Sequence, residues 1–319
     1  MKLPYRRLGR TGIRLSAISL GSWQTFGAGM DMATARRCIG KALDRGINFF
    51  DTADSYAGGD AERAIGELLR DVPREQYVLA TKCFFPTGAG ANQRGLSRKH
   101  IFDACRASLK RLQTGYIDVL QCHRFDETTP IGETVAAMTD LIRAGDVLYW
   151  GVSQWPATAI AEAVAIAERH GLVKPVSDQV RYHLLDRAAE GSVFDVCRAN
   201  GLGVLIYSPL AQGVLTGKYR GGAIPEGSRA DDADALAGMR YLLEPEKLAA
   251  VERLRAVAER ASIPLARLAI AWCLRDPLVV TAITGASSAE QIDDNLQAAG
   301  VALPPELLAE IDAATGAIR

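Results

Sequence analysis

The chain has 319 residues, of which 48% are hydrophobic and 23% charged, a composition typical of a folded globular protein and not of a disordered or collagen-like one. Lys plus Arg and Asp plus Glu number 37 each, without a long basic run, so we expect no nucleic-acid binding. No apolar stretch approaches the ~18 residues of a membrane span, and the first residues lack the apolar core of a signal peptide. We therefore expect a cytoplasmic protein that does not enter the membrane.

The cysteines and histidines indicate neither a disulfide framework nor a metal site. No two of the six cysteines form a C-x-x-C pair, and a chain of this length can build its core without disulfides. The histidines show no metal-ligand spacing. We expect buried, reduced thiols and no bound metal.

Short β-rich runs alternate along the chain with longer segments of helical period. A hairpin that turns at residues 9–12 is expected first. Eight strands are then predicted, at residues 17–20, 47–51, 77–82, 117–122, 147–152, 175–180, 203–207 and 279–283. The last interval is much longer than the others, and we expect a polar loop at 210–242 and two helices within it.

Strand followed by helix, repeated eight times, predicts parallel strands that close into a (β/α)8 barrel, here with an N-terminal hairpin and extra C-terminal helices. No linker rich in Pro, Gly and Ser divides the chain, so residues 1–319 are expected to form a single domain. The alternative is an open, doubly wound sheet with a Gly-rich turn after its first strand. Segment 20–27 has glycines at other spacings and a bulky Trp23, which disfavours such a dinucleotide site.

Four polar residues lie at or just beyond the ends of predicted strands, where a barrel carries its active site. Asp51 ends the second strand, Tyr56 follows it, and Lys82 and His123 end or follow the third and fourth. Taken singly, each has an explanation without catalysis. Asp51 could cap a helix, Lys82 could reach solvent and Tyr56 could be an aromatic residue at the barrel rim. The position of His123 could be due to chance. Together they predict one site: a carboxylate holds an ammonium, which lowers the pKa of a phenol that donates a proton. His123 would donate a hydrogen bond to a carbonyl oxygen.

These residues resemble the catalytic motifs of the aldo-keto reductase family, and the resemblance extends from the first strand to the last helix. The motifs are FDTADSY at 50–56, TK at 81–82, His123, YSPL at 207–210 and GASSAEQ at 285–291. The resemblance implies a (β/α)8 barrel that binds a nicotinamide cofactor without a Rossmann domain and reversibly reduces a carbonyl group. It also implies a catalytic tetrad of Asp51, Tyr56, Lys82 and His123.

The branch that this chain resembles most includes the potassium-channel β subunits. The residues that carry this likeness lie at 23–27, 217–219 and 265–275. The channel subunits have Asn at the position of His123. This difference favours an enzyme over the alternative, a regulatory subunit that holds the cofactor with little or no catalysis.

The resemblance further implies a set of cofactor-binding residues. Those near the nicotinamide are Ser22, Trp23, Asp51, Ser153, Gln154, Gln179 and, beneath the ring, Tyr207. Those around the pyrophosphate are Ser208, Pro209, Leu210, Gln212, Lys218 and Arg229. Lys218 and Arg229 also have a simpler interpretation as solvated loop charges.

At the adenosine end, the implied residues are Gly285, Ser287, Gln291, Asp294 and Asn295. Ser287 and Gln291 precede or begin a predicted helix, whose free N–H groups favour a 2′-phosphate. The same residues read as capping boxes, Ser287 with Glu290 and Ser288 with Gln291. NADP(H) is the expected cofactor. NAD(H) is the alternative, because many family members have an Arg where Gln291 stands and a Lys near Gly285, so this site lacks their direct positive charge.

The substrate is predicted only as a class. Loops 84–95 and 125–131 would line the substrate site and contain aromatic, Gly and polar residues without a charged clamp. We therefore expect a small carbonyl compound that is uncharged or weakly polar. A Schiff-base enzyme that uses Lys82 is a weaker alternative. The sequence does not indicate the oligomeric state.

Overall fold

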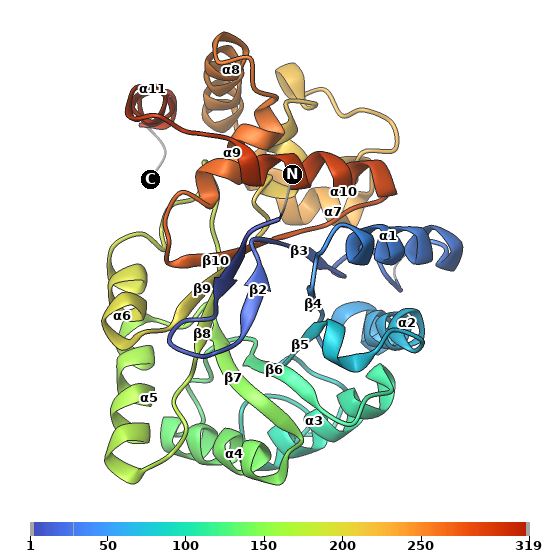
Figure 1. The fold of residues 1–319 in the computed structure, drawn as a ribbon, viewed down its shortest axis with the longest axis vertical. Coiled ribbons are helices and arrows are strands. Elements are labelled where there is room, and N and C mark those ends of the chain that lie inside the picture. The colour runs from blue at the N-terminus through green and yellow to red at the C-terminus, as the bar shows by residue number, and fades with distance from the viewer. Residues whose placement is uncertain (1–2, 28, 317–319) are drawn as a thin grey trace.

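The computed structural model describes residues 3–27 and 29–316 and contains a closed barrel of eight parallel strands (Figure 1). Each strand pairs with its neighbours in chain order, and the last one closes the ring against the first. The strands are β3 (Ile18–Gly21), β4 (Phe49–Asp51), β5 (Val78–Cys83), β6 (Ile117–Cys122), β7 (Val147–Ser153), β8 (Ser177–Arg181), β9 (Gly203–Tyr207) and β10 (Val279–Thr284). The predicted fold is confirmed, and the strand ends differ from the predicted ones by at most two residues.

The N-terminal hairpin closes one end of the barrel. Its strands, β1 (Tyr5–Arg7) and β2 (Arg14–Ser16), pair antiparallel around the predicted turn. Leu8 and Leu15 are fully buried and join an apolar cluster with Phe49, Val78 and other inward-facing strand residues. A site for a small molecule therefore has to lie at the opposite end, where the strands finish.

The side chains of β5 show how the barrel separates its interior from its outer layer. Val78 and Ala80 belong to the interior cluster, whereas Leu79 and Cys83 belong to the core between strands and helices. Because strand side chains alternate, Lys82 faces inward, above Ala80. Cys83 points away from it, as expected from this alternation, and all six cysteines are buried and free.

Helices surround the barrel and begin and end at residues suited to these positions. They are α1 (Met32–Asp44), α2 (Asp60–Leu69), α3 (Arg98–Leu112), α4 (Ile131–Ala144), α5 (Ala157–His170), α6 (Ser192–Asn200), α7 (Ala233–Met239), α8 (Pro245–Arg260), α9 (Leu265–Cys273), α10 (Ala289–Leu296) and α11 (Pro305–Thr315). Asp31 and Ser97 cap α1 and α3 through their side chains. Glycines in the left-handed conformation end α4, α5 and α6.

The segment predicted as a polar loop at 210–242 is more structured than expected. It contains short 3-10 turns and the helix α7, which follows a side-chain cap by Asp232. Polar and Gly residues dominate the sequence of this segment, but the fold buries several of its apolar side chains, and Met239 and Leu242 are fully buried. These anchors hold the segment against the barrel.

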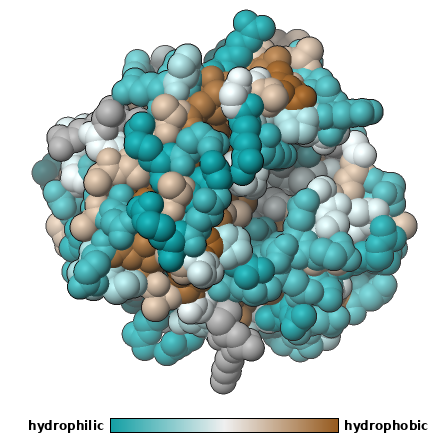
Figure 2. Space-filling model, turned by 90° about the horizontal axis from the view of Figure 1, so that it is seen from above, coloured by the Kyte–Doolittle hydropathy of each residue, from teal (hydrophilic) through white to brown (hydrophobic). Residues whose placement is uncertain are grey.

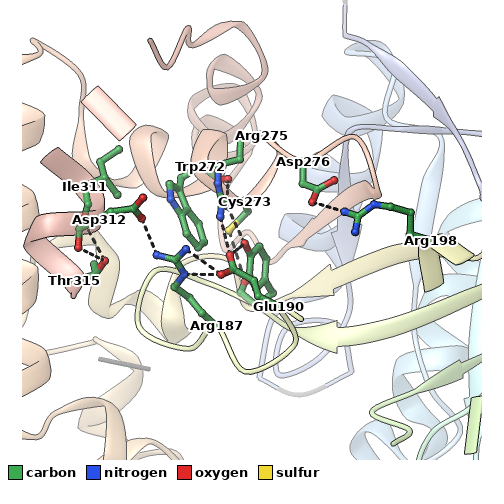
Figure 3. A network of polar contacts seen from close by, with 11 residues as sticks. Arg187, Glu190, Arg198, Trp272, Cys273, Arg275, Asp276, Ile311, Asp312 and Thr315 are labelled. Carbon is green, nitrogen blue, oxygen red and sulfur yellow. Dashed lines mark hydrogen bonds and ion pairs between the residues drawn. The ribbon is translucent and has the colours of Figure 1, made fainter. Parts of the chain in front are cut away.

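A polar network fixes α9 and α11 to the loop that follows β8 (Figure 3). Glu190 accepts hydrogen bonds from Arg275 at 2.7 Å and from Arg187 at 2.9 Å. Arg187 also pairs with Asp312 of α11 at 2.7 Å. The Arg275 guanidinium lies 3.7 Å from the ring centre of Trp272. These contacts attach the C-terminal helices to the barrel.

The face seen from above Figure 1 is largely hydrophilic, and its hydrophobic areas form small separate patches (Figure 2). Among the described residues, no helix combines the length and the apolar character that crossing a membrane requires.

Gly66 of α2 provides a test of how closely the helices pack. A Cβ atom at Gly66 would lie 2.7 Å from the carbonyl oxygens of Arg111 and Leu112 at the end of α3, so Gly66→Ala should lower the free energy of unfolding by about 1–3 kcal/mol. Gly40→Ala is the control, because Gly40 of α1 has open space around its Cβ position; it should raise stability by up to about 1 kcal/mol. Urea denaturation measures both. Equal effects would contradict close α2–α3 packing.

Candidate active site

The ends of β4 and β5 bring an acid and a base together inside the barrel. Lys82 is wholly buried, and its Nζ donates to Asp51 Oδ2 at 2.6 Å and to the carbonyl oxygen of Thr52 at 2.7 Å. The same Nζ lies 3.4 Å from the hydroxyl oxygen of Tyr56 and 4.9 Å from its ring centre. Three of the four predicted catalytic residues thus meet around one ammonium group.

The second oxygen of Asp51 is held by two amides. Gln121 and Gln179 donate from Nε2 to Asp51 Oδ1 at 3.2 and 2.8 Å. Burial lowers the pKa of Lys82, but Asp51 and Tyr56 raise it, and the net pKa is raised above its ordinary value. Because every donor and acceptor of the ion pair has a partner, the charged form is stable inside the barrel.

Sequence reasoning did not identify Gln121 or Thr52 as part of this site. Gln121 lies two residues before His123, so strand alternation alone would have placed it on the inner face of the barrel. Thr52 contributes its backbone carbonyl, for which the residue type carries no signal.

Tyr56 lies at the start of a short 3-10 segment, Tyr56–Gly59, in which Ala57 and Gly58 have positive φ angles of 48° and 63°. Burial raises the pKa of Tyr56, and the charge of Lys82 opposes this effect without overcoming it. The expected net lowering of the Tyr56 pKa is therefore wrong for this structure. The physical reason is that Asp51 neutralises part of the Lys82 field while burial disfavours the phenolate. Tyr56 is thus a protonated donor at neutral pH.

His123 is buried beside Tyr56. Its ring meets Tyr56 edge to face at 5.7 Å between centroids and Phe85 at 4.8 Å. Burial, followed by the charges of Lys82 and Arg124, lowers the pKa of His123 to about 2. Its Nδ1 has no hydrogen-bond partner among the described residues. The imidazole is therefore neutral and has hydrogen-bonding capacity for a ligand.

The residues predicted around the nicotinamide gather at the ends of β7, β8 and β9. Gln154, at a positive φ of 56°, donates from Nε2 to the Tyr207 hydroxyl at 2.6 Å. Ser153 donates to the backbone oxygen of Gln179 at 2.9 Å. Across the barrel mouth, the Ser22 hydroxyl donates to that of Thr52 at 2.8 Å.

The predicted pyrophosphate residues lie in the segment that follows β9. Ser208 and Gln212 have positive φ angles of 55° and 54°, and Pro209 is buried beside the half-buried Leu210. Lys218 is exposed near the ring of Tyr219, at 5.3 Å.

Arg229 approaches Trp23 although the two residues follow different strands, β9 and β3. Its guanidinium carbon lies 5.5 Å from the centre of the Trp23 ring, which belongs to the turn after β3 and is 39% exposed. Burial lowers the pKa of Arg229, so this residue is not a freely solvated loop charge. The contact places two predicted cofactor-binding residues, 206 positions apart in the chain, next to each other.

The residues predicted at the adenosine end differ from one another in exposure and in hydrogen-bond partners. Gln291 Oε1 accepts from the backbone N–H of Ser287 at 2.9 Å and from its hydroxyl at 3.2 Å. This pairing replaces the two expected capping boxes, since the N-cap residue Ser288 makes no side-chain cap bond. Asp294 is exposed and pairs with Arg267 at 2.9 Å, whereas Asn295 is buried and Gly285 is exposed.

A second buried polar cluster lies just outside the barrel wall. Glu62 is fully buried and accepts hydrogen bonds from Thr81 at 2.5 Å and from Arg111 at 2.6 Å. Asp54 is also buried, and neither of its carboxylate oxygens has a hydrogen-bond partner among the described residues. Burial and the nearby Glu62 raise the pKa of Asp54 to about 7. Within the described ranges, no three His, Cys, Asp or Glu side chains are arranged to hold a metal ion.

Asp54 makes stability depend on pH. Between about pH 4 and 7 the folded protein keeps a proton on Asp54 that the unfolded chain has lost, so stability falls as pH rises through this window. Asp54→Asn removes that titration. The free energy of unfolding of the variant, measured relative to the parent, should therefore be higher at pH 8 than at pH 5 by roughly 2–4 kcal/mol. Thermal unfolding at both values checks this. The exposed Asp44→Asn serves as the control, and an identical pH response in Asp54→Asn and the parent would contradict the assignment.

Comparison with known proteins agrees with this geometry. A sequence model of the aldo/keto reductase family matches residues 17–315. Similar proteins include a probable voltage-gated potassium channel subunit beta from Oryza sativa subsp. japonica, 43% identical over 98% of this chain and 96% of the relative. A probable subunit beta from Arabidopsis thaliana is 42% identical over 97% and 96%, and a putative one from Schizosaccharomyces pombe 42% over 97% and 92%. The chain therefore belongs to the aldo/keto reductase family of oxidoreductases.

Proposed function

We propose that the protein is an NADP(H)-dependent carbonyl reductase that converts an aldehyde or ketone to the alcohol, reversibly, as one domain of 319 residues. The observation that carries the proposal is the contact of the Lys82 ammonium with both Asp51 and the Tyr56 hydroxyl, beside a neutral His123. Reduction needs a hydride and a proton. The nicotinamide supplies the hydride when it is bound, and Tyr56 supplies the proton.

In this proposal each residue has a distinct task. His123 donates a hydrogen bond to the carbonyl oxygen, which its neutral imidazole can do without adding a charge. Tyr56 transfers its O–H proton to that oxygen as the carbonyl carbon receives the hydride. Lys82 then stabilises the phenolate that remains, and Asp51 keeps Lys82 in place.

The groups around the barrel mouth suit a dinucleotide cofactor. Lys218 and Arg229 form no ion pair with a described residue, so both cations are free to meet phosphate oxygens. The half-buried ring of Tyr207 offers a planar face beside Gln154. Ser153, Gln179 and Ser22 would hold the carboxamide end, and Ser287, Gln291 and Asn295 the adenosine end.

A second function is suggested by the names of the relatives, which describe them as probable or putative voltage-gated potassium channel subunits beta. The chain would then bind the cofactor as a regulatory subunit with weak or no catalysis. The complete set of Asp51, Tyr56, Lys82 and His123 favours the reductase. A Schiff-base enzyme is disfavoured, since Lys82 is buried and already bonded to Asp51 and Thr52.

Tyr56→Phe tests the proposed reductase, because it removes the proton and keeps the ring. The kcat for reduction of a generic aldehyde should fall by about 10²- to 10⁴-fold. Affinity for NADPH, followed by quenching of intrinsic fluorescence, should barely change. If the variant retains more than about a tenth of the parent kcat while hydride transfer limits the rate, Tyr56 is not the acid. A parent that binds NADPH but turns over no aldehyde would support the regulatory subunit.

Gln291→Arg tests the choice of NADP(H). The change adds a cation for the 2′-phosphate and releases the Ser287 N–H that Gln291 now occupies, so NADPH should bind more tightly while NADH is nearly unaffected. Gln297→Arg adds the same charge at the other end of α10 and should alter neither affinity. If the parent binds NADH as tightly as NADPH and Gln291→Arg changes neither, Ser287 and Gln291 serve only the helix start.

A further inference from the structure

Arg124 directly follows His123 at the end of β6, and its position suggests a role beyond the proposed tetrad. Its Nη1 donates to the backbone oxygen of His123 at 2.5 Å, and its guanidinium carbon lies 5.5 Å from the ring centre of Phe85. Phe85 in turn packs edge to face on His123. The half-buried guanidinium is therefore held one aromatic ring away from the residue that would orient the carbonyl.

The charge of Arg124 acts on both groups that would flank a bound carbonyl. It contributes to the low pKa of His123 and opposes the raised pKa of Tyr56. The geometry agrees, because the Phe85 ring that packs on His123 also contacts the guanidinium. An anion bound to Arg124 would thus lie next to His123, the residue proposed to orient the carbonyl group.

Arg124 has no counter-ion in the described part of the chain, unlike the buried Lys82 and the half-buried Arg111. The acid nearest in sequence, Asp126, is already engaged by the backbone N–H groups of Leu96 and Thr128. A half-buried guanidinium next to an aromatic ring retains donors that suit a planar carboxylate.

Arg124 follows β6, the strand that precedes one of the predicted substrate loops, and no predicted cofactor residue lies in the loop after this strand. Phe85 belongs to the loop after β5 and Arg124 to the loop after β6. Except for Asp51, the predicted cofactor residues lie in or after β7, β8 and β9 or follow β3 and β10. One guanidinium matches the single charge of a carboxylate, whereas a phosphate is usually held by several donors.

We propose that Arg124 is a specificity-determining residue that binds a carboxylate on the substrate, so that the preferred substrates are aldehydes or ketones that bear a carboxylate. This inference rests on the proposed reductase activity. Loops 84–95 and 125–131 predict an uncharged or weakly polar substrate, but they do not include position 124. The charge at this position leads to a different expectation.

The test compares 4-carboxybenzaldehyde with its methyl ester as substrates, with NADPH. The ratio of kcat/KM for the acid to kcat/KM for the ester should fall about tenfold or more in Arg124→Gln, mainly through KM of the acid. Arg124→Lys keeps the charge and should retain part of the preference. Arg169→Gln changes the same charge on the exposed end of α5 and should leave the ratio unchanged. The ratio cancels any general damage to His123.

A binding measurement separates this inference from the proposed activity. Benzoate should bind the parent about tenfold or more tightly than benzamide in the presence of NADP⁺, and Arg124→Gln should lose that difference. If the ester is reduced but the acid ratio and the benzoate preference are the same in the parent and Arg124→Gln, the inference is wrong and the activity stands. If benzoate is preferred through Arg124 but neither aldehyde is reduced, the proposed activity fails instead.

Discussion

The buried ion pair of Lys82 and Asp51 is the constraint on which the site depends. A fully buried ammonium is tolerated only when its charge is balanced and its donors are occupied. Asp51 on the neighbouring strand supplies the charge, and Gln121 and Gln179 supply donors for the carboxylate. Four strands, β4, β5, β6 and β8, therefore have to be in register for the pair to exist. The closed barrel fixes that register, because each strand is bonded on both sides.

The barrel also decides which of its ends is available. Leu8 and Leu15 of the hairpin fill the amino end of the interior, so the lower layer of inward side chains is apolar. The upper layer contains Lys82, Asp51, Gln121 and Gln179, all of them buried. A polar layer over an apolar plug leaves the ends of the strands as the place where the interior meets a ligand.

The sequence predicted the barrel and the strand-end residues well, because strand period and strand-end chemistry are local signals. It did not reveal Gln121 as a partner of Asp51, although the inward alternation from His123 points to it. Contacts between distant segments had no local signal, as the cluster of Glu62 and Arg111 and the approach of Arg229 to Trp23 show. The direction of the Tyr56 pKa was missed because burial depends on the fold as a whole.

The chain as a whole has no net formal charge, but not every charged group near the site has a partner of opposite charge. The carboxylate of Asp51 is fully engaged by Lys82 and two amides, whereas Arg124 has no counter-ion in the described chain. Burial, together with the charges of Lys82 and Arg124, keeps His123 neutral, and the same two cations oppose the effect of burial on the pKa of Tyr56. Of these two residues, only the phenol can then give up a proton, while the imidazole can hydrogen-bond without a charge. The division of labour between Tyr56 and His123 thus follows from their burial next to the cations Lys82 and Arg124.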